Sequence, residues 1–190
     1  MKIYDISREL FSAPVYPGDP SPSFERLRRM ELGDSYNLSG FYTGCHSGTH
    51  VDAPLHFLED GAPIDETGLE RYFGPCRVVR AKGILTGQDI EALRLRKGER
   101  VLFSGGAFVS LSAAYVLADA EVALVGTDQQ SIAPMGDEEA PHRELLRHEI
   151  ALLEGLCLDG VPEGRYTLCA FPLKLRGLEA SPVRAVLLQK

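Results

Sequence analysis

Three of the five histidines in this chain, His46, His50 and His56, lie within eleven residues, and Asp52 stands between the last two. Imidazole nitrogens and carboxylate oxygens are ligands that borderline divalent metals accept, and histidine also exchanges protons near neutral pH. The number of these candidate ligands, their chemical types and their close spacing all suit a metal ion. We therefore favour a metal site over histidines that only satisfy hydrogen bonds of the core.

The metal-capable residues of this cluster alternate with apolar residues along the chain. All four metal-capable side chains occupy even positions, whereas the odd positions from 51 to 57 are apolar. In an extended chain, neighbouring side chains point to opposite faces, so one face would carry the ligands and the other would pack into the core. A helix would also pair ligands four residues apart, but Gly48 and Pro54 argue against a continuous one. We expect a strand over 38–45, then a tight irregular segment that gathers the four groups.

A second pair of metal-capable side chains lies in the C-terminal half. Glu154 interrupts the otherwise apolar segment 150–158, and a carboxylate buried in such a strand must be paired, hydrogen-bonded or bound to a metal. His142 lies at the start of a predicted helix, after Pro141 and three acidic residues that favour a helix N-terminus. From spacing alone, an arginine such as Arg143 is an equally good partner for Glu154.

The elements that must position these groups alternate between strands and helices. Strands are predicted at 3–6, 76–81, 100–103, 122–125, 150–158, 166–171 and 183–188, with a short strand or hairpin arm at 24–30. Helices are predicted at 86–93, 111–117 and 142–148. Continuous apolar strands between helices indicate parallel pairing inside an α/β core.

Three loops are candidates for the walls of a binding pocket. Segment 13–22 contains four prolines and is predicted to be a rigid loop that could hold Tyr16 over a substrate, although a plain surface loop is equally consistent. Segments 104–106 and 126–131 follow consecutive strands, and ligands of α/β sheets gather beyond the carboxyl ends of strands. Gly105 and Gly106 do not complete a nucleotide-binding fingerprint.

Composition limits the class of protein. The 190 residues fit a single domain over 1–190, and 44% hydrophobic with 25% charged residues is ordinary for a soluble globular chain. The net charge of −7 opposes nucleic-acid binding. No apolar segment could span a membrane, no signal peptide is apparent and no C-x-x-C pair occurs, so we expect a cytoplasmic protein with free thiols.

The segment from His46 to Phe57 resembles the H-x-G-T-H-x-D-x-P-x-H-F signature of the cyclase family, whose members include bacterial kynurenine formamidase and isatin hydrolase. Segments 4–7, 15–19 and 126–128 and the spacing from His142 to Glu154 are similar to further parts of that family. The resemblance implies a compact α/β domain of the swivelling β/β/α type. Its mixed sheet would be partly barrel-like, with helices outside.

The resemblance also implies roles for particular residues. One divalent ion would be bound by His46, His50 and Asp52, and Asp52 would bridge to a second ion held by His142 and Glu154. His56 matches the acid/base residue proposed for the family. Tyr16 stands where formamidases commonly have a tryptophan, and it is the candidate substrate-binding residue of a chain without tryptophan. Zinc is usual in the formamidases and manganese in isatin hydrolase, and members commonly form dimers or tetramers.

These features predict a metal-dependent hydrolase of a small aryl formamide, cyclic amide or related cyclic carbonyl compound. Two divalent ions would exceed the charges of Asp52 and Glu154 by two, so water bound there could ionise near pH 7 and an oxyanion would be stabilised. His56 could then carry the proton to the leaving nitrogen. The alternatives are a non-hydrolytic cyclase or dehydratase and a regulatory module that binds metal without catalysis. A serine hydrolase is disfavoured because no G-x-S-x-G motif occurs.

Overall fold

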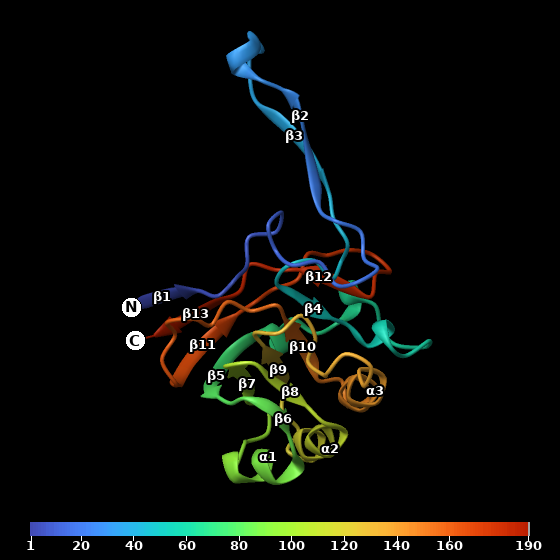
Figure 1. The fold of residues 1–190 in the computed structure, drawn as a ribbon, viewed down its shortest axis with the longest axis vertical. Coiled ribbons are helices and arrows are strands. Elements are labelled where there is room, and N and C mark those ends of the chain that lie inside the picture. The colour runs from blue at the N-terminus through green and yellow to red at the C-terminus, as the bar shows by residue number, and fades with distance from the viewer. Residues whose placement is uncertain (190) are drawn as a thin grey trace.

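The computed structural model describes residues 1–189 and is drawn in Figure 1. Nine strands form one curled, mixed sheet in the spatial order β1-β13-β11-β5-β7-β9-β10-β4-β12. Their bounds in that order are Lys2–Asp5, Val186–Gln189, Gly164–Cys169, Phe73–Arg80, Arg100–Ser104, Leu124–Thr127, Ala151–Glu154, His50–Asp52 and Ala180–Pro182. The central four, β5, β7, β9 and β10, run parallel, and the outer strands pair antiparallel. The predicted α/β fold with a mixed, partly barrel-like sheet is confirmed.

Three helices cover one face of the parallel strands (Figure 1). They are α1 (Gly87–Leu93), α2 (Leu111–Asp119) and α3 (Glu139–Arg147). The first two begin where the sequence predicts, because Thr86 and Asp89 form a capping box and the Ser110 hydroxyl accepts a hydrogen bond from the backbone N–H of Ala113. A short parallel pair, β6 (Gly83–Leu85) and β8 (Ala107–Val109), lies beside them.

The central strands are buried on both faces, as their continuous apolar sequences predict. In β7, Val101 and Phe103 pack toward the helices, whereas Leu102 packs into a second core inside the curl of the sheet. That second core also contains Val51 and Leu153. The segment that connects β4 to β5 contains short 3₁₀ turns, which are η2 (Pro54–His56), η3 (Ile64–Glu66) and η4 (Leu69–Tyr72).

One hairpin stands outside this body. Within residues 1–189, strands β2 (Ser23–Arg28) and β3 (Leu38–Tyr42) pair only with each other, and a 3₁₀ turn, η1 (Met30–Leu32), lies near their far end. Figure 1 shows the pair projecting away from the sheet. The sequence predicts a strand or hairpin arm here, and we refer to Ser23–Tyr42 as the arm.

Several predicted boundaries are wrong. The strand expected over 38–45 ends at Tyr42, and the one expected over 150–158 ends at Glu154, because Gly155 adopts a left-handed φ of 67°. Strands β4, β6, β8 and β12 were not predicted, since three residues are too few to show a period. Within residues 1–189, no helix has the length and apolar character needed to cross a bilayer.

Candidate metal centre

Strand β4 brings two of the candidate ligands into the sheet. It lies between β10 and β12, and in the antiparallel register His50 is opposite Glu154 while Asp52 is opposite Leu152. Directly opposed residues of an antiparallel pair share a face of the sheet. Because Leu152 belongs to the core beneath the helices, His50, Asp52 and Glu154 all point to the helix-covered side.

Helix α3 supplies a further candidate ligand on that side. His142 is buried in the helix, and its Nδ1 lies 2.7 Å from the carbonyl oxygen of Glu138. A carbonyl only accepts hydrogen bonds, so Nδ1 carries the proton and the neutral ring has a lone pair on Nε2. That Nε2 faces Glu154 Oε1 at 3.2 Å. Two acceptors in this arrangement are stabilised when a cation or a proton lies between them.

The same tautomer is fixed in His50. Its Nδ1 donates to the carbonyl oxygen of Gly48 at 3.2 Å, so Nε2 is again the free ligand atom. His50 Nε2 lies 3.5 Å from Asp52 Oδ1 and 3.3 Å from Glu154 Oε2. Glu154 is held in place by the backbone N–H of Ile132, which donates to its Oε1 at 2.6 Å.

The candidate ligands form two triads that share one carboxylate. Ligand atoms of His46, His50 and Asp52 lie within 4.8 Å of one another, and so do those of Asp52, His142 and Glu154. His46 enters from the loop before β4, with Nδ1 3.1 Å from Asp52 Oδ1. The structure thus brings all five predicted metal ligands to one place.

Unpaired polar atoms show that this place fits a cation. Within residues 1–189, Nε2 of His46, Nε2 of His50 and both carboxylate oxygens of Asp52 are buried without a hydrogen-bond partner. Burying a carboxylate without partners is costly, and native proteins normally avoid it. Bound divalent cations would satisfy these atoms, because nitrogen and oxygen donors of this kind suit them.

The charges of the centre support the same interpretation. Burial by itself raises the pKa of the Asp52 carboxyl, but the neighbouring His46 and His50 outweigh it and hold that pKa below its usual range. Burial lowers the pKa of His46, yet the adjacent negative charge of Asp52 raises it to about 9. For Glu154, burial and Asp52 raise the pKa, but the adjacent His142 and His50 bring it below its usual value. Both carboxylates are therefore anionic, and a cation would compete with a proton on His46.

His56 lies beside the triads and belongs to neither. It is the last residue of η2, and its ring centroid is 4.1 Å from that of His46 and 6.0 Å from that of His142. Burial lowers the pKa of His56, and the neighbouring histidines add to this effect while Asp52 opposes it. The ring is therefore neutral near pH 7, with a nitrogen able to accept a proton.

A cavity of about 340 Å³ opens over the triads, and its lining includes Tyr16, His56 and Phe57. Tyr16 comes from the proline-rich loop, where the Asp19 N–H donates to the Tyr16 carbonyl at 3.0 Å. Gly18, the third residue of that turn, has a φ of 98°, which glycine adopts without strain after a proline. The loop therefore forms one wall of the cavity through Tyr16 and Asp19.

Two side chains attach this loop to the opposite wall. The Tyr16 hydroxyl donates to Glu138 Oε1 at 2.5 Å, and Gln130 Nε2 donates to the carbonyl oxygen of Pro14 at 2.9 Å. The hydrogen bond to Glu138 raises the pKa of Tyr16 to about 12, so the hydroxyl keeps its proton. Glu138 thus joins the loop through its side chain and orients His142 through its carbonyl. No sequence pattern predicted this residue.

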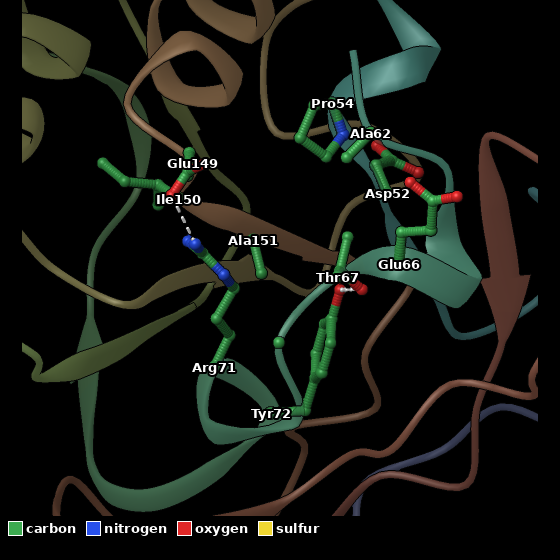
Figure 2. Close-up of a pocket in the computed structure, with 11 residues that line it drawn as sticks. Asp52, Pro54, Ala62, Glu66, Thr67, Arg71, Tyr72, Glu149, Ile150 and Ala151 are labelled. Atoms are coloured by element: carbon green, nitrogen blue, oxygen red, sulfur yellow. Dashed lines mark hydrogen bonds and ion pairs between the residues drawn. The ribbon is translucent and has the colours of Figure 1, made fainter.

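A second, smaller cavity of about 60 Å³ borders Asp52 from another side (Figure 2). The Tyr72 hydroxyl and Thr67 Oγ1 lie 2.9 Å apart in its lining, and Arg71 pairs with Glu149 at 2.6 Å. A space of this size holds a few water molecules and is too small for an aryl substrate. The larger cavity is the candidate substrate site.

Other features near the centre differ from the expectations. Segment 126–131 lines the cavity through Gln130 and Ser131, whereas the carboxylate of Asp128 accepts hydrogen bonds from the N–H groups of Gly105 and Gly106 and so ties two loops together. Arg143, the alternative partner of Glu154, pairs with Glu139 instead. Glu179, which the sequence did not indicate, has Oε1 3.5 Å from His46 Nε2.

The chain resembles known proteins over most of its length. The Cyclase family model matches residues 4–134. The chain is 38% identical over 201 residues to kynurenine formamidase of Erythrobacter litoralis (strain HTCC2594), covering 98% of this chain and 93% of that protein. A solved structure described as a potential metal-dependent hydrolase with cyclase activity is 33% identical, with a TM-score of 0.84 over 98% of this chain and 96% of that one. Isatin hydrolase A from Labrenzia aggregata shares the fold, with a TM-score of 0.86 over 100% and 94% of the two chains at 20% identity.

Proposed function

The chain belongs to the cyclase family, and on that premise we propose that it is a metal-dependent hydrolase that cleaves the amide bond of a small aryl formamide or cyclic amide. One structural observation carries the proposal. Two triads of metal-capable side chains share the buried Asp52, and their other four members line a cavity large enough for a small molecule. The similarity to a kynurenine formamidase over nearly the whole chain supports the choice of bond.

We assign the metal ligands as two sets. His46, His50 and Asp52 would hold one divalent ion, and Asp52, His142 and Glu154 a second, with zinc as the first candidate and manganese as the alternative. Divalent cations supply Lewis-acid activation of water and of a substrate carbonyl. The Nδ1 hydrogen bonds of His50 and His142 to backbone carbonyls orient the two rings and leave Nε2 of each as the nitrogen available to a metal ion.

The remaining steps are assigned to residues that line the cavity. Hydrolysis of an amide needs a proton on the leaving nitrogen, and His56 lies beside both triads with a neutral ring that can accept a proton and return it. Tyr16 and Phe57 offer aromatic surfaces against which an aryl group would stack. We therefore assign His56 as the acid/base residue and Tyr16 as a substrate-binding residue.

The decisive experiment measures formate released from N-formylkynurenine by the protein loaded with zinc or with manganese. We expect turnover that disappears when a chelator removes the metal. Isatin and simple lactones complete the panel. Absence of turnover on every amide would refute the hydrolase assignment, whereas turnover of isatin alone would shift the substrate to a cyclic amide.

Labelled water distinguishes hydrolysis from a non-hydrolytic cyclase or dehydratase. In ¹⁸O-water, a hydrolase places one labelled oxygen in the carboxylate product, and mass spectrometry of the formate detects it. Product formed without label would favour the non-hydrolytic reaction. We also propose that the protein is a homo-oligomer, as the resemblance to the family implies.

A further inference from the structure

The two nitrogens of the His46 ring face two different carboxylates. Nδ1 lies 3.1 Å from Asp52 Oδ1, the carboxylate shared by the triads, and Nε2 lies 3.5 Å from Glu179 Oε1. Nε2 is buried and has no hydrogen-bond partner within residues 1–189. The two nitrogens of an imidazole point away from each other, so one partner cannot serve both. The ring therefore needs one partner on the side of Asp52 and another on the side of Glu179.

His46 differs in this respect from the other two histidines of the triads. His50 and His142 turn Nδ1 to a backbone carbonyl, 3.2 Å and 2.7 Å away, which leaves Nε2 for a metal ion. His46 instead turns Nδ1 to Asp52. Two donors that each lie about 2.0 Å from a tetrahedral ion are about 3.3 Å apart, so the separation of 3.1 Å suits an ion held between Nδ1 and Asp52. An ion there leaves the ring proton on Nε2, and this N–H needs an acceptor.

The carboxylate of Glu179 is placed to be that acceptor. Its contact with His46 is its only ion pair among residues 1–189, so no other charged partner competes for it. His46 lines the large cavity and Glu179 does not, which puts the carboxylate away from the space for a substrate. Histidines that bind metal usually donate their second ring N–H to a carboxylate, a carbonyl or water. Such a partner fixes the orientation of the ring and raises its basicity.

The backbone of Glu179 is held against the strand that carries two of the ligands. The Ala53 N–H donates to the Glu179 carbonyl at 2.9 Å. Ala180, the first residue of β12, is opposite Asp52 in the antiparallel register. The sheet therefore fixes the point from which the Glu179 side chain starts. His46, in contrast, comes from the loop before β4, so its ring needs a contact that holds it.

We propose that Glu179 is a positioning residue of the metal centre, which accepts a hydrogen bond from His46 Nε2–H and thereby directs Nδ1 of that ring to the metal ion. This role rests on the proposed metal centre and does not depend on hydrolase activity. Because the contact acts through His46, its loss should weaken binding of the ion held by His46, His50 and Asp52.

Nitrogen NMR of the zinc-loaded full chain tests which ring atom binds the ion. Long-range ¹H–¹⁵N spectra distinguish a metal-bound nitrogen from one that carries a proton. We expect His46 to bind zinc through Nδ1 and to keep its proton on Nε2, the reverse of His50 and His142. In Glu179→Ala, this proton should exchange with water about tenfold faster or more, because a charged acceptor is lost. Zinc bound to Nε2 of His46 in the wild type would overturn the proposal.

Zinc affinity, measured by competition with a chromophoric chelator, shows whether the contact matters for binding. Glu179→Ala should bind zinc about 10–100-fold more weakly than the wild type, the usual effect of removing the outer partner of a metal ligand. Glu179→Gln should lose less, since its amide oxygen still accepts a hydrogen bond. The matched control, Glu59→Ala, removes an exposed carboxylate three residues after His56 and should bind zinc as the wild type does.

The denaturation midpoint of the metal-free protein separates positioning from a general structural role. It should be the same in Glu179→Ala and the wild type, because the Glu179 side chain is 37% exposed and such an ion pair contributes little to stability. A folded Glu179→Ala protein that binds zinc as tightly as the wild type or the control would overturn the proposal.

The wild-type spectrum decides the question even if the alanine variant fails to fold. A wild type that binds no zinc would refute both the metal centre and the role of Glu179. Tight zinc binding without turnover on any amide would refute the proposed activity and leave the role of Glu179 standing.

Discussion

Asp52 is the residue on which the proposed centre depends. It is the only residue common to both triads within the described chain, and its two oxygens have no hydrogen-bond donor there. A carboxylate can bridge two cations because each oxygen offers a lone pair in a different direction. Two features beside the triads can be altered without changing a proposed metal ligand. They are the side chain of His56 and the hydrogen bond between Tyr16 and Glu138.

Replacing His56 with alanine should separate proton transfer from metal binding. Because His56 belongs to neither triad, the His56→Ala protein should keep the metal content of the wild type, measured by elemental analysis. Turnover should fall by about 10²–10⁴-fold, the usual contribution of an acid/base residue. Loss of metal would instead identify His56 as a ligand. Unchanged turnover would show that the proton takes another route.

The Tyr16–Glu138 hydrogen bond should set the affinity for aryl substrates. Tyr16→Phe and Glu138→Gln should each raise KM for an aryl formamide about tenfold, the effect of losing one charge-assisted hydrogen bond, with kcat unchanged. Because Tyr16→Phe removes the donor of this hydrogen bond and Glu138→Gln removes the charge of its acceptor, the double variant should be no worse than Tyr16→Phe alone.

Asp137→Asn is the matched control for the Tyr16 and Glu138 variants, because it neutralises the exposed carboxylate next to Glu138 in the chain. It should leave KM unchanged. Metal content should remain that of the wild type in every variant, since the Glu138 carbonyl that orients His142 is retained. Effects of Tyr16→Phe and Glu138→Gln that simply add would show that the contact does not position the loop.

At the scale of elements, the centre depends on how closely β4 approaches the end of β10. The loop before β4 and the residue after β10 meet at Gly48 and Gly155, where a Cβ on Gly155 would lie 2.2 Å from the Gly48 carbonyl oxygen. Thr49 joins the same segments, because its hydroxyl donates to the Gly155 carbonyl at 2.7 Å and accepts from the Arg8 N–H at 2.9 Å. This contact holds His50 opposite Glu154.

A methyl group at Gly155 should therefore disrupt the centre. We expect Gly155→Ala to lower the free energy of unfolding by about 3 kcal/mol or more, since the clash is with backbone and adds to the strain of a left-handed residue. Gly160→Ala is the matched control, because Gly160 has a φ of 76° and open space around its Cβ position. It should cost only about 1 kcal/mol. Equal costs in chemical denaturation would show that the close approach is not what requires glycine.

At the scale of the whole molecule, metal binding should stabilise the fold, because the ligands come from distant parts of the chain. A ligand present at 100 times its dissociation constant adds about 2.7 kcal/mol, which for this size corresponds to a rise in Tm of roughly 5–10 °C. Treatment with a chelator should lower Tm by that amount in differential scanning calorimetry. Asp52→Asn, which removes the shared charge, should reduce the shift by at least half. If the chelator left the wild-type Tm unchanged, the triads would bind no metal tightly.

The sequence by itself determined the ligand types, the first half of the centre and the class of fold. His46, His50 and Asp52 are neighbours in the chain, so their spacing alone indicates a shared site. Helices α1 and α2 were predictable because their caps are local hydrogen bonds between residues three apart. The alternation of apolar strands with helices similarly indicated parallel strands buried on both faces.

Only the tertiary structure decided which distant residues complete the centre. Glu154 could have paired with an arginine, and its place opposite His50 follows from the register of β4 on β10. Strand β4 is too short to have a period of its own, and its neighbours on both sides supply its hydrogen bonds. The Tyr16–Glu138 contact joins residues 122 apart in sequence. Such contacts depend on packing between elements, which local propensity and spacing do not encode.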